Sequence, residues 1–445
     1  MIPLATAQRR SDQKLAVRCD PVVARYRAFF GLLDWSQIRE RDPERAWPGR
    51  QVPHPQSAYI KALLVKLCEQ KAYVTDLRRY LVEHPALVLE LGFRPVVAPE
   101  QPFGFDVERT VPGARWLRHQ QQHLDHQLIQ AVFAATVLAL QREIPGLGTT
   151  VAVDVKHIYA WVQENNPKAY VAERYAPDRQ PRGDPGCRLG VKRATNQARA
   201  TDPPKLRKEY VWGYGTGLAS ATDPRYGDVV LAEWTQPFNE QDVTYFHPVY
   251  RQVTAALGRA PTNVAADAAF DAWHVHQTCF ETGGTAAIPL NLRGQAPPNR
   301  DADGRPRCAN GLTMVPWRQF THEDGYRVQR FGCPLLLPTP TGQACDDPHF
   351  RSDNGCVTGI NTEPGGLMRA TLDRHSDDYK AIYRQRTSAE RINSQATALG
   401  IERPRVRNAH SVARLNTLTY ILINARALSR AQALNAALST APTKC

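Results

Sequence analysis

The chain has 445 residues, enough for several domains of ordinary size or one large domain with insertions. Lysine and arginine number 56 against 43 acidic residues, a formal net charge of +13 that favours polyanionic partners such as nucleic acid. The longest nearly apolar run, residues 131–140, is too short to cross a bilayer, and residues 1–14 lack the apolar core of a secretory signal. Nine widely spread cysteines are typical of a reducing compartment, so we expect a cytoplasmic protein without a membrane span.

Apolar periodicity predicts short helices early in the chain. From residue 57, apolar side chains recur at helical spacing on one face: Tyr59, Ile60, Leu63, Leu64, Leu67 and Cys68. Two further helices are expected over residues 75–81 and 85–91, the second ending at Gly92. Their outer faces are expected to carry basic side chains: Lys61, Lys66, Lys71, Arg78 and Arg79. Such a region is either a DNA-docking module or a plain helical packing domain with a solvated basic face.

A longer helix is expected over residues 115–143, and the breakers at 145–148 mark a domain boundary after it. His119, His123 and His126 would share one face of this helix, at a spacing that suits a metal ion. The neighbouring glutamines instead indicate a polar, solvated surface, and no cysteine or glutamate completes a ligand set.

A strand is predicted within residues 148–161, because Val151, Val153 and Val155 are β-branched and alternate along one face. Asp154 lies on the opposite face. A carboxylate there must be paired, solvated in a cleft or bound to a metal, since burying it unpaired costs several kcal/mol. A salt bridge to Lys156 or an exposed sheet edge would also account for it.

An α/β layout follows. Basic residues 188–208 are expected to form a loop that stays mobile or orders on a polyanion. Strands are then expected over residues 209–221, 228–236, 263–267 and 285–291. A helix that begins at Asp242 is expected before the third of these strands, and a helix over residues 273–280 before the fourth. Asp267 ends the third of these strands, at the sheet edge where ligand groups collect. The order βββαβαβ predicts a mixed sheet.

The composition changes at Gly294. Residues 294–348 are rich in proline and glycine without a sustained period, which indicates an insertion. Four cysteines in it and its continuation could bind a structural zinc ion: Cys308, Cys333, Cys345 and Cys356. No Cys-x-x-Cys pair supports that interpretation.

Regular structure resumes with a helix predicted from the cap Ser376 to Gly400. Its buried stripe would hold Ile382, Ala389, Ile392, Ala396 and Leu399. A neighbouring polar face would hold Tyr383, Arg386 and Glu390, and a third face Lys380, Arg384 and Arg391. Two interpretations are open. The helix could bring Glu390 to the edge of a sheet while the neighbouring cations contact phosphate, or it could be a solvated amphipathic helix without a functional role. A last helix is expected over residues 410–428.

Three segments together carry a family resemblance. Residues 151–154, residues 264–271 and the pattern Tyr383-x-x-Arg386-x-x-x-Glu390 resemble the Asp-Asp-Glu transposases of bacterial insertion sequences. The most similar branch has a last motif of Tyr, Arg, Glu and Lys on a helix. The likeness extends from the helices after residue 57 to the closing helices. The lysine of the motif falls on Thr397 here, and Arg391 or Arg384 would have to substitute for it.

The resemblance implies an α/β fold: an RNase H-like mixed sheet flanked by helices, with an N-terminal helical domain and a loop-rich insertion before the last catalytic helix. The expected regions are the N-terminal helical, DNA-binding part (1–146), the first part of the catalytic core (147–293), the insertion (294–374), and the last part of the core with the C-terminal helices (375–445).

It also implies an activity, namely cleavage of DNA at the ends of an insertion sequence and strand transfer into target DNA. Asp154, Asp267 and Glu390 would be the catalytic residues and hold Mg²⁺ or Mn²⁺, because hard oxygen ligands select such ions and two of them can drive phosphodiester displacement. The residues expected to contact DNA are Tyr383, Arg386, Lys380, Arg384 and Arg391. The implied partners are duplex DNA, as terminal repeats and as target, and a second copy in a homodimer, in a bacterial cytoplasm at the nucleoid. A nuclease of the same fold without strand transfer, or a non-catalytic DNA-binding relic, are the alternatives.

Overall fold

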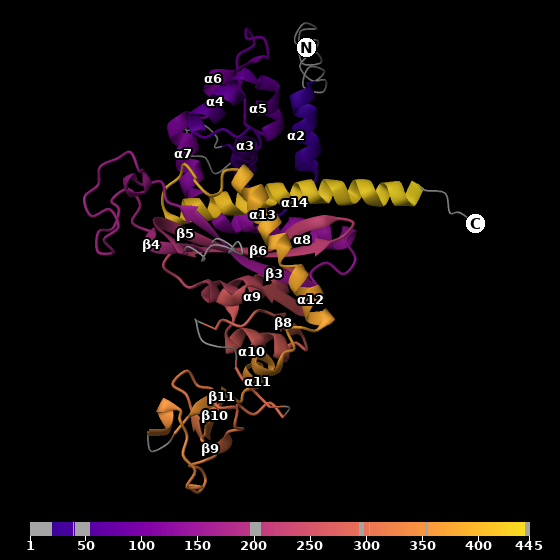
Figure 1. Ribbon diagram of the computed structural model, residues 1–445. Helices are drawn as coiled ribbons and strands as arrows, with labels where there is room; N and C mark the ends of the chain where they lie inside the picture. The colour runs from indigo at the N-terminus through magenta and orange to yellow at the C-terminus, as the bar shows by residue number, and fades with distance from the viewer. Residues whose placement is uncertain are drawn as a thin grey trace, which may run out of the picture. The chain divides into compact units, whose positions relative to one another are not determined.

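A computed structural model describes residues 20–38, 40, 54–195, 206–292, 298–301, 303–351 and 355–440. The chain forms two compact units. Their helices and strands are labelled in Figure 1. The first unit comprises Met1–Gly148, Asp154–Arg259 and Ser388–Cys445, and the second comprises Thr149–Val153 and Ala260–Thr387. Within the described ranges, no helix combines the length and the apolar character that crossing a bilayer requires.

The first unit begins with helices. They are α2 (Pro21–Gly31), α3 (Gln56–Cys68), α4 (Val74–Glu83), α5 (Pro85–Leu91), α6 (Val107–Thr110), α7 (Ala114–His123) and α8 (His126–Glu143), with the short strands β1 (Val96–Val97) and β2 (Phe105–Asp106). The three helices predicted after residue 57 are confirmed, and Gly92 ends α5 in the left-handed region at φ 92°. The prediction for Lys66 was wrong, because its side chain is buried at 7% exposure and burial lowers its pKa to about 8.

The single helix predicted over residues 115–143 is two helices. Leu124 is extended between them, and the Asp125 carboxylate accepts a hydrogen bond from the backbone N–H of Gln127, which starts α8 anew. His119 and His123 stack on each other in α7, whereas His126 lies within hydrogen-bonding distance of the Thr417 hydroxyl, 2.9 Å away. The three histidines therefore do not share one helix face.

The sheet in the first unit is built from β3 (Thr150–Tyr159), β4 (Arg188–Thr195), β5 (Leu206–Asp223) and β6 (Gly227–Pro237). β5 lies between β3 and β4 and also pairs with β6. The loop predicted over residues 188–208 was wrong at both ends, because β4 pairs antiparallel with β5 from Arg188 and Gly213 to Thr195 and Leu206. Strand pairing satisfies the backbone there although the sequence is polar. Residues 196–205, in the middle of the predicted loop, lie outside the described residues.

Helices cover this sheet. α9 (Phe246–Leu257) packs on β5 and β6, and α14 (Ala409–Thr440) packs on α8 and β6, as the long yellow helix of Figure 1 shows. The buried Asn424 side chain in α14 binds the backbone N–H and C=O of Val230, at 2.9 and 2.8 Å. The last helix predicted from the sequence is confirmed, and it extends twelve residues further, from 428 to 440.

The second unit contains the parallel strand pairs. The first residues of β3 pair with β7 (Asn263–Ala266), and β7 pairs with β8 (Thr285–Ala287). Helices α10 (Trp273–Glu281), α11 (Pro364–Thr371) and α12 (Asp377–Arg384) belong to the same unit. Asp271 stabilises it, because its buried carboxylate accepts two hydrogen bonds from Arg369, at 2.8 and 2.6 Å. The α/β class and a mixed set of strands flanked by helices are thus confirmed.

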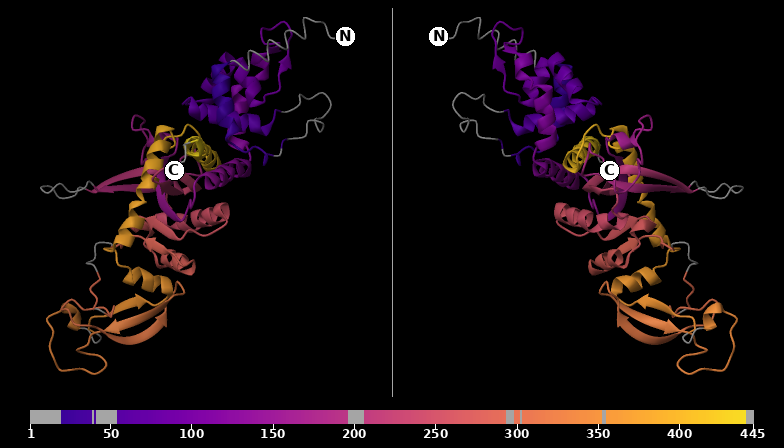
Figure 2. Two further views of the ribbon diagram at one scale, coloured as in Figure 1. Left: turned by 90° about the vertical axis from the view of Figure 1, so that its right-hand side faces the viewer. Right: turned by 90° about the vertical axis from the view of Figure 1, so that its left-hand side faces the viewer.

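The insertion has regular structure that the sequence did not predict. β9 (Val315–Thr321), β10 (Arg327–Gly332) and β11 (Thr358–Asn361) form an antiparallel sheet in the order β11-β10-β9, drawn in orange in Figure 2. A small cluster of Cys308, Met314 and Phe331 packs within the insertion, with Cys356 and Ile360 against it. The prediction of a loop-rich insertion therefore holds only for the segments between these strands.

The helix predicted from residue 376 to 400 is also divided, into α12 and α13 (Thr387–Ala398). Gln385 and Arg386 donate their backbone N–H groups to carbonyls three residues back, those of Ile382 and Tyr383, so the chain tightens into a turn. The Thr387 hydroxyl donates to the carbonyl of Arg384 and competes with the helical pattern.

Candidate active site

A cavity of about 350 Å³ in the first unit contains two of the predicted catalytic residues, Asp154 and Glu390. Three elements meet there: β3, β4 and α13. The other lining residues are Val155, Lys156, His157, Lys192, Asn393, Ser394 and Thr397. Residues distant along the chain thus share one hollow, as the resemblance implied for Asp154 and Glu390.

The burial pattern of α13 determines which of its side chains reach the cavity. Ala389, Ile392 and Ala396 are fully buried, which fixes one face of the helix against the unit. Arg391 is held on another side by Asp228, through two hydrogen bonds of 2.7 Å. Glu390 and Asn393 are therefore left to line the cavity, one helical turn apart.

Asp154 is oriented by Asn393. The Asn393 Nδ2 donates to the Asp154 Oδ2 over 2.8 Å, although the two residues are 239 positions apart in the chain. The Oδ1 of Asn393 is buried and accepts no hydrogen bond from any residue that the structure describes. Lys156, which the sequence offered as a salt-bridge partner of Asp154, has its ammonium 2.8 Å from Glu402. The amide of Asn393 therefore fixes one oxygen of the Asp154 carboxylate at the cavity.

Positive charge lines the same cavity. Lys156 and Lys192 both face it, and together with burial, which is the larger cause, they lower the pKa of His157 to about 4. His157 is consequently neutral near neutral pH. Thr397 lines the cavity too, and its hydroxyl donates to the backbone carbonyl of Asn393. The cations beside Thr397 are therefore the two lysines, whereas Arg391, one of the predicted substitutes, is engaged with Asp228.

Sequence reasoning missed Asn393, His157 and Lys192. Asn393 could have been found, because a residue three positions after Glu390 lies on the same side of a helix. Lys192 could not, because its position depends on the pairing of β4 with β5.

The other predicted residues lie in the second unit. Asp267 directly follows β7, and its carboxylate accepts from the backbone N–H of Ala269, so that it caps the turn Ala268–Phe270. Tyr383 stacks on Tyr379, and the Arg386 guanidinium lies 5.7 Å from the centre of the Tyr383 ring. The Lys380 ammonium is 3.7 Å from the Asp377 carboxylate, and Arg384 ends α12.

Metal binding was predicted for the three carboxylates and considered for the histidines and the cysteines. In the part of the chain that the structure describes, no group of three or more His, Cys, Asp or Glu side chains is arranged to hold a metal ion. The metal set of Asp154, Asp267 and Glu390 stays a prediction. The chemistry of the lining nonetheless fits a hard cation, since Asp154, Glu390 and Asn393, which line the cavity together, all carry side-chain oxygen atoms.

Comparisons with known proteins add little to this geometry. No family model matches the sequence, and no curated protein matches it. Three chains of solved structures match, among them a piggyBac transposase synaptic complex with hairpin DNA. That alignment covers 95% of this chain and 82% of the other, at 11% identity and a TM-score of 0.29. A TM-score this low carries no argument about fold or activity, so the functional inference depends on the residues themselves.

Proposed function

We propose that the chain is a transposase of the Asp-Asp-Glu type, which cuts DNA at the ends of its own element and joins those ends to target DNA. The observation that carries the proposal is the cavity shared by Asp154 and Glu390. Two carboxylates, one of which accepts a hydrogen bond from the amide nitrogen of Asn393, share this cavity with two lysines. Such a lining suits a phosphodiester substrate, because the acids hold cations and the lysines attract phosphate.

The proposed ligands are Asp154, Asp267 and Glu390, with Mg²⁺ or Mn²⁺ as the cofactor. Asp267 is supported by the register of the parallel strands, since Val153 pairs with Ala266 and each aspartate is the next residue along the chain. When bound, two such ions supply a lowered pKa for the attacking hydroxyl and charge stabilisation for the departing oxygen. Asn393 holds the Asp154 carboxylate in place through its 2.8 Å hydrogen bond.

Phosphate positioning is proposed for cations of both units. Lys156 and Lys192 line the cavity. The resemblance adds Tyr383 and Arg386, with Lys380, Arg384 and Arg391 as further DNA contacts. Arg391 has a second proposed role besides DNA contact. Its two hydrogen bonds to Asp228 support the proposal that it fixes α13 on β6. A homodimer that pairs two element ends in a bacterial cell is part of the same proposal.

The test is cleavage of a labelled duplex that carries the terminal repeat flanking the coding region, in Mg²⁺, in Mn²⁺ and in EDTA. Asp154→Asn and Glu390→Gln are each expected to lower the cleavage rate by at least about 100-fold, since losing a ligand removes several kcal/mol of charge stabilisation. The matched control is Glu240→Gln, an exposed glutamate outside the cavity, which should cleave normally. Full cleavage by both variants would refute the assignment.

Pre-cut ends separate the remaining alternatives. Joining of such ends to a plasmid supports a transposase, and cleavage without joining indicates a nuclease of the same fold. Tight binding of the ends with no cleavage in either metal indicates a DNA-binding relic.

A further inference from the structure

A second site in the first unit begins with an alternating sequence. In residues 402–407, Arg403, Arg405 and Arg407 are exposed, while Pro404 and Val406 are buried. Turns and bends at Glu402, Arg403 and Arg405 shape this segment, and all three arginine side chains line the same cavity. The segment is anchored to the end of β3, because the backbone N–H of Tyr159 donates to the carbonyl of Glu402 over 2.9 Å.

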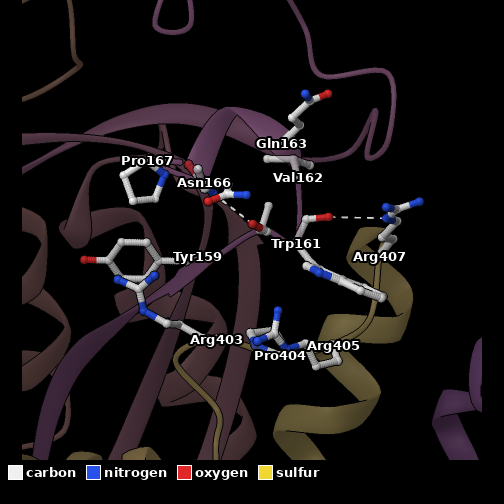
Figure 3. A pocket seen from close by; sticks show the side chains of 12 residues that line it. Tyr159, Trp161, Val162, Gln163, Asn166, Pro167, Arg403, Pro404, Arg405 and Arg407 are labelled. Carbon is white, nitrogen blue, oxygen red and sulfur yellow. Dashed lines mark hydrogen bonds between the residues drawn. The ribbon is translucent and has the colours of Figure 1, made fainter. Parts of the chain in front are cut away.

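The arginines surround a cavity of about 520 Å³ that also contains two aromatic rings (Figure 3). The Arg403 guanidinium lies 4.2 Å from the centre of the Tyr159 ring. Those of Arg405 and Arg407 lie 5.9 and 5.0 Å from the Trp161 ring. The other lining residues are Ala160, Val162, Gln163, Asn165, Asn166, Pro167 and Pro404.

The positive charge of this cluster is only partly offset by nearby carboxylates, because Glu402 interacts electrostatically with Arg403 while its salt bridge is with Lys156. Among the residues described, none of the three arginines forms an ion pair with a carboxylate. Glu402 is paired with Lys156, and Glu209 accepts a hydrogen bond from the Tyr159 hydroxyl. A guanidinium that packs its face on a ring keeps its N–H groups in the plane, where they can donate to phosphate.

The mixture of rings, prolines and guanidinium planes distinguishes this cavity from a simple phosphate-binding surface. Bases in a duplex are stacked on one another, so a duplex offers such a site only its backbone. An unpaired nucleotide offers a base face for stacking and a phosphate for the arginines, the combination that single-strand-binding proteins use. We propose that this cavity binds unpaired nucleotides of a DNA strand, with a base against Trp161 and phosphates at Arg403, Arg405 and Arg407.

The arginine cavity and the candidate active site lie along the same strand, β3. This nearness suggests a role for the cavity in DNA cleavage, although the proposed binding of unpaired nucleotides does not depend on it. Residues 154–157 of β3 line the candidate active site, and the cavity begins at Tyr159. Five residues of strand span about 17 Å. A strand held here is therefore within a few nucleotides of Asp154.

The test is fluorescence anisotropy with a mixed-sequence 20-nucleotide single strand and the corresponding duplex, at one salt concentration. The full-length chain carries Asp154→Asn throughout, so that binding is measured whether or not the chain cleaves DNA. Trp161→Ala is expected to weaken single-strand binding by about 5- to 150-fold, the range for one lost base stack. Trp161→Phe should restore most of it. Arg405→Ala should weaken single-strand binding at least threefold more than duplex binding.

The control is Arg318→Ala, which removes an arginine from the face of another tryptophan, Trp317, 4.8 Å from its ring centre. This variant should leave single-strand binding within twofold of the parent. Equal losses for single strand and duplex on Arg405→Ala, or unchanged single-strand binding by a folded Trp161→Ala chain, would overturn the proposal. If the Trp161→Ala chain does not fold, a double variant with Arg403→Ala and Arg407→Ala is used instead. It should weaken single-strand binding more than duplex binding, and equal losses would overturn the proposal.

Discussion

His157 shows how burial and charge act on one side chain beside Asp154. Burial, then Lys192 and Lys156, lowers its pKa to about 4 in the folded chain, below the 6.5 of an unperturbed histidine. The neutral form therefore stabilises the fold above pH 6.5, and that stability is lost as the pH falls towards 4. The limiting slope for one such group is about 1.4 kcal/mol of unfolding free energy per pH unit.

We predict that His157→Gln flattens this dependence. Urea unfolding of the parent and the variant at pH 7, 6 and 5 measures it, and the parent should lose about 1 kcal/mol more per pH unit than His157→Gln does. The comparison removes contributions from other histidines, which both chains share. His375→Gln, which replaces an exposed histidine, should keep the slope of the parent. Equal slopes for parent and His157→Gln would show that the imidazole titrates normally.

At the same scale, the resemblance selected two acids, Asp154 and Glu390, that line one cavity, and their catalytic role stays a prediction. Neither acid could be assigned from its own segment, because a salt bridge or a solvated helix face would account for each one alone. Lys192 and the arginines around Trp161 were not assigned, since their meeting depends on strand pairing and on a chain segment that returns to β3. Long-range pairing of this kind has no local signature.

Among the elements, β5 is constrained by three glycines at every second position: Gly213, Gly215 and Gly217. A Cβ at Gly213 would overlap the backbone carbonyl of Ile158, and one at Gly217 would lie 2.7 Å from the Cβ of Tyr245. β5 can therefore approach the Ile158 carbonyl of β3 at Gly213, and the Tyr245 side chain at Gly215 and Gly217, only because these positions lack side chains.

Gly213→Ala is predicted to destabilise the chain by about 1–3 kcal/mol or more, because a backbone carbonyl cannot move aside as a flexible side chain can. The midpoint and slope of urea unfolding measure the loss. Gly31→Ala is the matched control, since nothing lies within 4 Å of its added Cβ and the change should be within about 0.5 kcal/mol. A Gly213→Ala chain as stable as the control would mean that β3 and β5 are further apart than described.

The sequence predicted some of the helix and strand boundaries correctly and missed others. The sequence predicted the existence of α5 and its end at Gly92, where one residue type decides the backbone. It predicted one helix where α12 and α13 are two, because side-chain periodicity continues across the turn at residues 385–386. The sheet of β9 to β11 was missed because its residues are interrupted by prolines and glycines and bury few apolar side chains.

For the whole molecule, the net charge of +13 predicts how binding depends on salt. A chain that neutralises six to ten phosphates should lose roughly 10³ to 10⁵ in duplex affinity between 50 and 200 mM salt, because counterions are released on binding. Anisotropy titrations of the parent over that range measure the slope of log affinity against log salt. Duplex affinity that hardly changes with salt would mean that phosphate contacts contribute little.

The arginine cavity should account for a defined part of that slope. Removing Arg403, Arg405 and Arg407 together is expected to reduce the single-strand slope by about 2, at roughly 0.7 for each phosphate that the chain no longer neutralises. Arg318→Ala should reduce it by less than about 0.7, since only one arginine, outside the cavity, is removed. Because the slope counts neutralised phosphates whereas Trp161→Ala reports on stacking, the two measurements together separate charge from base recognition. An unchanged slope in the triple variant would mean that the chain binds the phosphates of the single strand at another surface.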